Sequence, residues 1–204
     1  SQPIRICLFD SLLDIGCGDG RLLQELAGEY LDINTLGVDY SKQPIEMPRG
    51  MSSYLGLEVV DFLGKELNWQ SDTVTAIERS EHISPDQMHA SISRMADAVI
   101  ERGRMVVTVS RENEQIQDKH YQHFQHFSEA GLAELLIPWF DSVVPLNRQS
   151  KLFTALELAV GGRDNRIVVN SPPILNALWG LYNQRYLYAP SESKCKRIAV
   201  VCEK

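Results

Sequence analysis

Residues 11–23, SLLDIGCGDGRLL, constrain the fold more than any other part of this 204-residue chain. An apolar run is followed by glycines at positions 16, 18 and 20, and then by residues that suit a helix. Glycine lets a ligand approach the backbone closely, and the start of a helix offers free N–H groups. The stretch therefore predicts a strand, a ligand-binding turn and a helix. Its spacing differs from the GxGxxG of dinucleotide folds, because position 21 is arginine.

Apolar runs bounded by turn residues recur along the chain, as expected for buried strands. They are SLLDI (11–15), TLGVD (35–39), LEVVD (57–61), TVTAIE (73–78), RMVVTV (104–109), DSVVPL (141–146) and KRIAVVCEK (196–204). Helix-like segments lie between several of them, at 21–30, 85–100 and 128–140, and Ser128 is a suitable N-cap for the last. Strands that alternate with helices indicate an α/β fold with a parallel sheet.

The interval between the last two predicted strands is unusually long. Residues 147–195 contain no clear strand, whereas 172–188 is rich in aromatic residues and suits a helix. We expect this interval to be an insertion that covers the substrate at the end of the sheet. Its aromatic residues either line the acceptor pocket or form a core-facing helical stripe. They are Trp179, Tyr182, Tyr186 and Tyr188.

The composition fits one globular domain over residues 1–204. Apolar residues make up 44% of the chain, and no run approaches the roughly 18 apolar residues of a membrane-spanning helix. The cysteines lack metal-binding spacing and suit reduced, buried thiols. They are Cys7, Cys17, Cys195 and Cys202. We expect a cytoplasmic protein without a membrane partner. The net charge of −7 disfavours a nucleic acid partner and mildly favours a small or uncharged substrate.

Two acidic residues beside the glycine turn narrow the choice of ligand. Asp14, directly before the turn, places a carboxylate where it can hold an ammonium group and where a pyrophosphate would be repelled. Asp39, at the end of the second predicted strand, lies at the offset where a carboxylate accepts hydrogen bonds from both ribose hydroxyls. An amino acid joined to a nucleoside satisfies both residues.

With these residues in place, the sequence resembles the class I S-adenosylmethionine-dependent methyltransferases. LLDIGCGDG (12–20) is similar to their first motif, GVDYS (37–41) to their second-strand motif and VVDF (59–62) to the end of their third strand. The resemblance covers roughly residues 11–146 and the final strand. It implies S-adenosyl-L-methionine as the cofactor and a doubly wound, seven-stranded Rossmann-like sheet whose last strand is antiparallel.

The resemblance also implies which residues contact the cofactor. Asp14 and Gly16 would lie near the methionine part, Asp39 on the ribose, and Asp61 with Phe62 near the adenine. The full set expected in the cofactor site is Asp14, Gly16, Cys17, Gly18, Gly20, Asp39, Tyr40, Asp61, Phe62 and Glu78.

The fourth predicted strand runs into AIERSEHISPDQ (76–87), which brings Glu78, Glu81 and His82 to the carboxyl edge of the sheet. Methyl transfer needs an aligned nucleophile, and a base when that nucleophile is a hydroxyl. His82 is the best candidate for this base, because histidine titrates near neutral pH. Alternatively, His82 only caps the next helix or orients the loop. His123 is the second catalytic candidate.

All five histidines lie between residues 82 and 126, and KHYQHFQHFS (119–128) holds His120, His123 and His126. One interpretation is a divalent metal ion held by two carboxylates and two imidazoles, similar to the site of the small-RNA 2′-O-methyltransferase family. Its ligands would be Glu78, Glu81, His82 and His123. The other interpretation is the ExxEH pattern of methyltransferases that bind no metal, which we prefer. Arg79 and Ser80 depart from the usual apolar residues between the two glutamates, and the basic and aromatic features that grip an RNA end are missing.

Together these features predict a methyltransferase that acts on a hydroxyl group of a small molecule or a glycan. Two alternatives stay open: metal-dependent 2′-O-methylation of RNA, and a non-catalytic, cofactor-binding partner of another methyltransferase. The intact Gly16, Gly18 and Asp39 argue against the second alternative. The sequence does not specify whether the acceptor atom is oxygen, nitrogen or carbon, because one fold serves all three.

Overall fold

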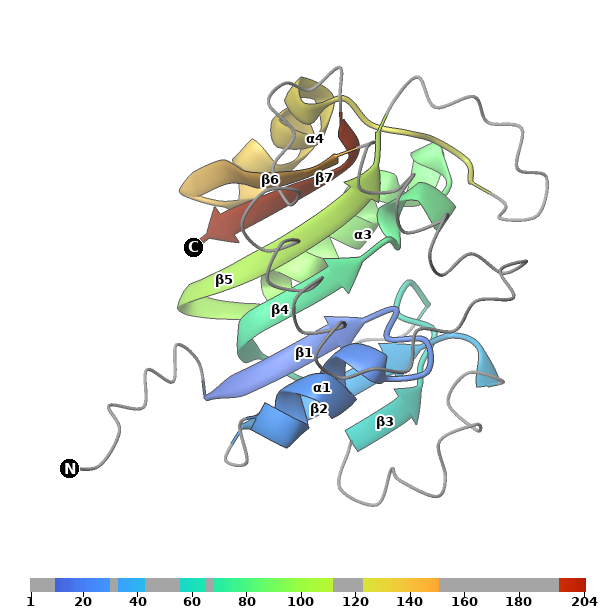
Figure 1. Ribbon diagram of the computed structural model, residues 1–204, viewed down its shortest axis with the longest axis vertical. Coiled ribbons are helices and arrows are strands. Elements are labelled where there is room, and N and C mark those ends of the chain that lie inside the picture. Colours follow the sequence, from blue (N-terminus) through green and yellow to red (C-terminus); the bar gives the residue numbers. More distant parts are fainter. Residues whose placement is uncertain (1–9, 30–32, 43–55, 65–67, 112–122, 151–194) are drawn as a thin grey trace, which may run out of the picture.

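Seven strands form one mixed sheet in the order β3-β2-β1-β4-β5-β7-β6 (Figure 1). The computed structural model describes residues 10–29, 33–42, 56–64, 68–111, 123–150 and 195–204. The strands are β1 (Ser11–Ile15), β2 (Asn34–Asp39), β3 (Gly56–Val59), β4 (Ser71–Ile77), β5 (Val99–Ser110), β6 (Ser142–Ser150) and β7 (Cys195–Glu203). Their pairings are parallel except for those of β7 with β5 and β6, so the predicted antiparallel last strand is confirmed.

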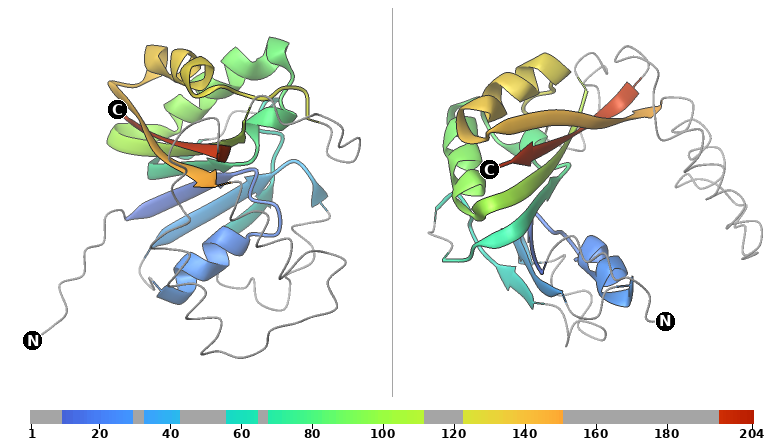
Figure 2. Two further views of the ribbon diagram at one scale, coloured as in Figure 1. Left: turned by 45° about the horizontal axis from the view of Figure 1, so that its top comes forward. Right: turned by 90° about the vertical axis from the view of Figure 1, so that its left-hand side faces the viewer.

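Helices cover both faces of the sheet (Figure 2). Helix α1 (Arg21–Glu29) lies on one face, and α3 (Pro85–Asp97) and α4 (Glu129–Leu136) lie on the other. Short 3-10 turns η2 (Ser80–His82) and η3 (Ile137–Trp139) follow β4 and α4. The doubly wound α/β architecture is therefore confirmed.

The hydrophobic core explains the apolar runs of the central strands. Leu13 and Ile15 of β1 and Val74 and Ala76 of β4 are completely buried. Helices on both faces cover these strands, so a continuous apolar run suits them better than strict alternation. The core also takes in α3 and α4 through Ile92, Met95, Leu132 and Leu136.

The strand order reverses beside β1. From β1 the chain moves outward to β2 and β3, and it then returns to β4 on the other side of β1. Open α/β sheets bind ligands beyond the carboxyl ends of the strands at such a reversal. The residues just after β1 and β4, Gly16 and Glu78, are thus placed on the two sides of the expected crevice.

Several element boundaries differ from those predicted. The helix predicted over 85–100 ends at Asp97, because Val99 already pairs with Ser71 as the first residue of β5. Strand β6 continues to Ser150, so residues 147–150 belong to the sheet and not to the predicted insertion. Residues 151–194 lie outside the described part of the chain, together with the four aromatic residues predicted to cover the acceptor. The covering role and the single-domain organisation stay predictions.

Two of the cysteines can be assessed. Cys17 and Cys202 are buried free thiols, and burial raises the pKa of each to about 12. The expectation of reduced, buried thiols is met at these two positions. Among the described helices, none is long and apolar enough to cross a membrane.

Candidate functional site

The glycine turn after β1 is hydrogen-bonded to the end of β2. Gly16, Gly18 and Gly20 have φ angles of +78°, +55° and +73°, in the left-handed region that favours glycine. The N–H groups of Gly16 and Cys17 both donate to the carbonyl oxygen of Val38, at 2.7 and 3.1 Å. The turn therefore has a fixed position next to the last residues of β2.

Space beside the turn differs from one glycine to the next. A Cβ atom at Gly16 would lie 2.7 Å from Cδ of Arg79, whereas a Cβ at Gly18 would meet nothing within 4 Å. The absence of a side chain at Gly16 thus permits a close approach by Arg79. At Gly18 only the backbone conformation requires glycine.

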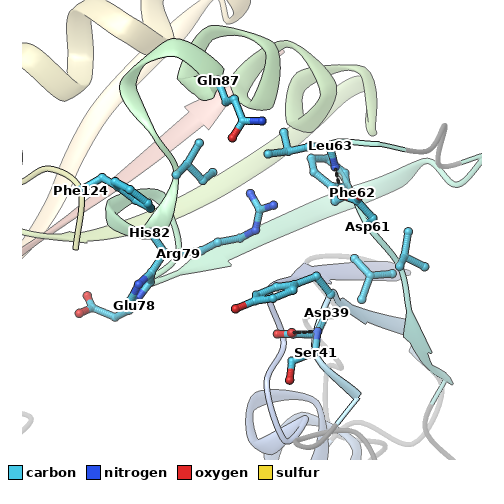
Figure 3. A pocket seen from close by; sticks show the side chains of 15 residues that line it. Asp39, Ser41, Asp61, Phe62, Leu63, Glu78, Arg79, His82, Gln87 and Phe124 are labelled. Atoms are coloured by element: carbon cyan, nitrogen blue, oxygen red, sulfur yellow. Dashed lines mark hydrogen bonds between the residues drawn. The ribbon is translucent and has the colours of Figure 1, made fainter. Parts of the chain in front are cut away.

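A pocket of about 620 Å³ opens beside this turn (Figure 3). This volume lies within the range of small-molecule and cofactor sites. The first wall comes from the ends of β1, β2 and β3, and the second from the segment after β4, the start of α3 and Phe124. The lining residues are Gly16, Val38, Asp39, Tyr40, Ser41, Val60, Asp61, Phe62, Leu63, Glu78, Arg79, His82, Ile83, Gln87 and Phe124.

Six residues of the predicted cofactor set line this pocket: Gly16, Asp39, Tyr40, Asp61, Phe62 and Glu78. The other four do not. Cys17 and Asp14 are buried behind the turn, and Gly18 and Gly20 lie further along it. The sequence predicted that the ends of these strands lie at one edge of the sheet. The structure shows that the ends of β1, β2 and β3 line a single pocket there.

Asp39 is held in a fixed orientation at the end of β2. One carboxylate oxygen accepts a hydrogen bond from the N–H of Gly18 at 3.0 Å, and the other accepts from the N–H of Ser41 at 2.8 Å. An ionised carboxylate has about four acceptor positions, so two remain for a ligand. Asp39 is thus preorganised to accept hydrogen bonds from a diol.

Asp61 and Phe62 form the wall at the end of β3. Oδ1 of Asp61 accepts from the N–H groups of Leu63 and Gly64, at 3.2 and 3.1 Å, and this fixes the turn. Phe62 is buried, and the guanidinium carbon of Arg79 lies 5.1 Å from the centre of its ring. This wall combines an acceptor group with an aromatic face.

Asp14 occupies a different environment. The side chain is 3% exposed, and Oδ1 accepts a hydrogen bond of 2.7 Å from the hydroxyl of Thr75. Burial raises the pKa of Asp14 to about 6, and the negative charge of Asp39 adds to the increase. Its predicted contact with an ammonium group stays a prediction.

Arg79 is the main pocket residue for which the sequence predicts no role. Its aliphatic part packs on Gly16, and its Nη1 donates to the hydroxyl of Ser91 at 3.2 Å. Burial lowers the pKa of Arg79 to about 10, while Asp39 and Asp61 favour its charged form. A cation therefore lies in the middle of the pocket at neutral pH (Figure 3). The sequence signal was the charged residue in a position that is usually apolar.

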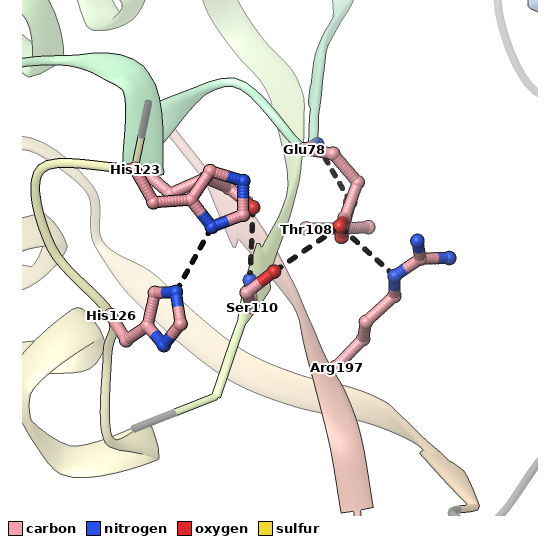
Figure 4. Close-up of polar contacts among 7 residues, drawn as sticks. Glu78, Thr108, Ser110, His123, His126 and Arg197 are labelled. Carbon is pink, nitrogen blue, oxygen red and sulfur yellow. Dashed lines mark hydrogen bonds and ion pairs between the residues drawn. The ribbon is translucent and has the colours of Figure 1, made fainter. Parts of the chain in front are cut away.

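Glu78 follows β4 with a φ angle of +50°, a strained conformation for a residue other than glycine. Its carboxylate accepts from Thr108 Oγ1 at 3.2 Å and from Ser110 Oγ at 3.5 Å, and it forms an ion pair of 2.9 Å with Nε of Arg197 (Figure 4). Burial raises the pKa of Glu78, although Arg197 acts in the opposite direction.

The rings of His82, His123 and His126 lie next to one another. His82 is exposed and lines the pocket, and its ring meets that of His123 edge to face, with centroids 4.7 Å apart. Nδ1 of His123 is 3.0 Å from Nε2 of His126 (Figure 4). Of the two predicted catalytic residues, only His82 lines the pocket. His123 does not line it but contacts the ring of His82.

The four ligands of the alternative metal site do not converge. Glu81 is completely buried, and its Oε1 accepts from the N–H of Ser110 at 3.2 Å, while Glu78 is paired with Arg197. Within the described ranges, no group of three His, Cys, Asp or Glu side chains is arranged to hold a metal ion.

The fold and the pocket together define a class of protein. A doubly wound sheet places a glycine turn, a fixed carboxylate at the end of β2 and an acidic residue at the end of β3 around one pocket at the strand-order reversal. These are the features of a Rossmann-like domain that binds a nucleoside-containing ligand.

Comparison with known proteins narrows this class. Residues 13–105 match a family model described as a methyltransferase domain. A probable fatty acid methyltransferase of Pseudomonas putida is 27% identical over 108 residues, which cover 50% of this chain and 27% of that protein. The chain thus matches about a quarter of the length of this curated relative.

Solved structures share the fold. A SAM-dependent methyltransferase from Archaeoglobus fulgidus aligns with a TM-score of 0.63 at 19% identity, covering 95% of this chain and 86% of that one. The phosphoethanolamine N-methyltransferase 2 of Haemonchus contortus, in complex with S-adenosyl-L-methionine, aligns at 0.66 and 17% identity, covering 96% and 48%. Over residues 13–105 the chain is thus similar to methyltransferase domains, and it shares the fold of S-adenosylmethionine-dependent methyltransferases.

Proposed function

We propose that this protein transfers a methyl group from S-adenosyl-L-methionine to a hydroxyl group of a small molecule or a glycan. The observation that carries the proposal is that one pocket joins the fixed carboxylate of Asp39 to the exposed imidazole of His82. The first group suits a ribose and the second suits an acceptor that must lose a proton.

The pocket residues fit the cofactor. Asp39 keeps free acceptor positions for two ribose hydroxyls, and Asp61 with the face of Phe62 suits an adenine. Near the methionine part, the side chain of Arg79 packs on Gly16, and the buried Asp14 lies directly behind the turn. When bound, the cofactor supplies an electrophilic methyl group on a sulfonium.

His82 would act on the acceptor. It removes the proton from the acceptor hydroxyl while the new oxygen–carbon bond forms and the carbon–sulfur bond breaks. Because the imidazole is exposed, it then releases this proton to solvent. The contact with His123 restricts the orientation of the His82 ring.

The chemistry of the acceptor is only partly constrained. Structural relatives include proteins named as N-methyltransferases and as O-methyltransferases, so the fold does not select the acceptor atom. Ile83 and the exposed ring of Phe124 provide an apolar surface beside His82. This surface suits an acceptor with a hydrocarbon or aromatic part, in keeping with the name of the fatty acid methyltransferase that this chain resembles.

A mass-spectrometric screen tests the proposal. Cell extract is incubated with S-adenosyl-L-methionine and the protein, and products that gain a methyl mass are identified. We expect a methylated hydroxyl compound, formed also in the presence of a chelator, and a decrease of about 10²–10⁴-fold in turnover for His82→Ala. A product methylated at nitrogen or carbon, or on the 3′ end of RNA, would contradict the proposal. Cofactor binding without any product would favour the non-catalytic partner.

A further inference from the structure

Arg197 lies at the ligand-binding edge because β7 is antiparallel to its neighbours. Its register partner is Ser110, the last residue of β5, whereas Arg104 near the other end of the same ladder pairs with Glu203. The first residues of β7 therefore meet the carboxyl ends of the parallel strands. Arg197 is placed beside the pocket although it is far from the other site residues in the sequence.

Glu78 holds only one nitrogen of Arg197. The ion pair joins Nε of Arg197 to Oε2 of Glu78 at 2.9 Å. Both terminal Nη groups point away from Glu78 (Figure 4), and neither forms a hydrogen bond or ion pair within the described part of the chain. The guanidinium thus presents two parallel donor groups whose direction is fixed by Glu78.

Backbone strain and burial at Glu78 both add a free-energy cost to this ion pair. Glu78 has a strained φ angle of +50°, and its partly buried carboxylate accepts hydrogen bonds from Thr108 and Ser110. Burial raises the pKa of Glu78, so keeping it ionised opposes folding. An ion pair with an arginine that is 46% exposed contributes little stability in return. Strained backbone is typical of functional sites.

The two free Nη groups have a clear chemical preference. An arginine fork binds carboxylates and phosphates through two parallel hydrogen bonds, and fixing its orientation in advance reduces the entropy lost on binding. Glu78, His82 and Phe124 line the second wall of the pocket, on the side away from Asp39 and Asp61 (Figure 3). An anion on Arg197 would therefore belong to the acceptor and not to the nucleoside.

We propose that Arg197 binds an anionic group, a carboxylate or a phosphate, of the methyl acceptor, which is thus a small amphiphilic acid; this assignment rests on the methyl transfer proposed above. The anionic group is a recognition element and not the nucleophile. The apolar part of the acceptor packs on Phe124, which is 61% exposed, and its hydroxyl faces His82.

Calorimetric titration of the protein saturated with S-adenosylhomocysteine tests this proposal. The probes are octanoate, octyl phosphate and octanamide, which share one apolar chain and differ in charge. We expect at least one of the two acids to bind at least tenfold more tightly than the amide. Whether octanoate or octyl phosphate binds more tightly distinguishes a carboxylate from a phosphate acceptor.

Variants identify the residue responsible. Arg197→Gln should abolish the preference for acids, Arg197→Lys should keep part of it, and Arg104→Gln, at the other end of the β5–β7 ladder, should leave it unchanged. If Arg197→Gln does not fold, Arg197→Lys still tests the fork, because it keeps the charge. Equal binding of acids and amide by the wild-type protein, no binding of either acid, or an unchanged preference in the folded Arg197 variants would overturn the proposal. Failure to bind S-adenosylhomocysteine would instead refute the proposed methyl transfer.

Discussion

Asp14, Asp39 and Asp61 lie close to one turn, but their environments give them different properties. Asp39 and Asp61 accept hydrogen bonds from backbone N–H groups and line the pocket, whereas Asp14 is buried behind the turn with one bond from Thr75. Backbone donors favour the ionised form of a carboxylate, and burial opposes it. The predicted contact of Asp14 with an ammonium group would use its ionised form, which burial disfavours.

Asp14→Asn should stabilise the fold at neutral and alkaline pH. The pKa of Asp14 is raised to about 6 in the folded protein, so its ionisation opposes folding. The cost is absent below the unfolded pKa of about 4, grows as the pH rises through 6 and is then constant. Urea unfolding should show a gain on the order of 2 kcal/mol at pH 8 and little change at pH 4. Asp19→Asn, at an exposed position, is the control. Equal destabilisation by Asp14→Asn at both pH values would refute this account.

Gly16→Ala should reduce both cofactor affinity and stability. The new Cβ would lie 2.7 Å from Cδ of Arg79, and the φ angle of +78° is unfavourable for alanine. We expect at least tenfold weaker binding of S-adenosylhomocysteine and a loss of about 1–3 kcal/mol in the free energy of unfolding. Gly18→Ala has open space and should cost only about 1 kcal/mol. Indistinguishable effects of the two substitutions would show that Arg79 does not pack on Gly16.

At the scale of elements, the boundaries follow from pairing partners that a sequence does not reveal. The first residues of β5 include Glu101 and Arg102, which read as a turn, but Val99 pairs with Ser71 and extends the strand. The end of β6 is polar, NRQS, and was assigned to the insertion because it shows no apolar run, but its pairing with β7 carries the strand to Ser150. Helix starts were easier to predict, because capping is local.

Ser128→Ala tests whether the N-cap residue stabilises the start of α4. The hydroxyl of Ser128 accepts a hydrogen bond of 3.1 Å from the N–H of Gly131 at the start of α4. Loss of an N-cap costs about 1 kcal/mol, which should lower the melting temperature of a chain of this size by roughly 2–4 °C. Ser128→Asp keeps an acceptor and should retain most of the stability. A melting temperature of Ser128→Ala equal to that of the wild type would show that α4 starts without help from this residue.

At the scale of the whole molecule, the strand order decides which residues meet. The sequence motifs were sufficient to place Gly16, Asp39, Asp61 and Phe62 at one site, because each lies at the end of its own strand or within three residues of it. Arg197 could not be predicted, since its position depends on the antiparallel entry of β7 between β5 and β6. Arg79 was visible as an unusual residue, but its packing on Gly16 depends on β1 and β4 being neighbours.

Asp39 is predicted to bind the ribose of S-adenosyl-L-methionine in this pocket, and calorimetric titration with S-adenosylhomocysteine tests this role. Hydrogen bonds to a charged group contribute about 1.5–3 kcal/mol each, so Asp39→Ala should weaken binding at least tenfold. Asp141→Ala, at an exposed position beside the start of β6, should bind like the wild type. We expect the wild-type protein to bind S-adenosylhomocysteine and not NAD. An unchanged dissociation constant for Asp39→Ala, or binding of NAD alone, would contradict this role.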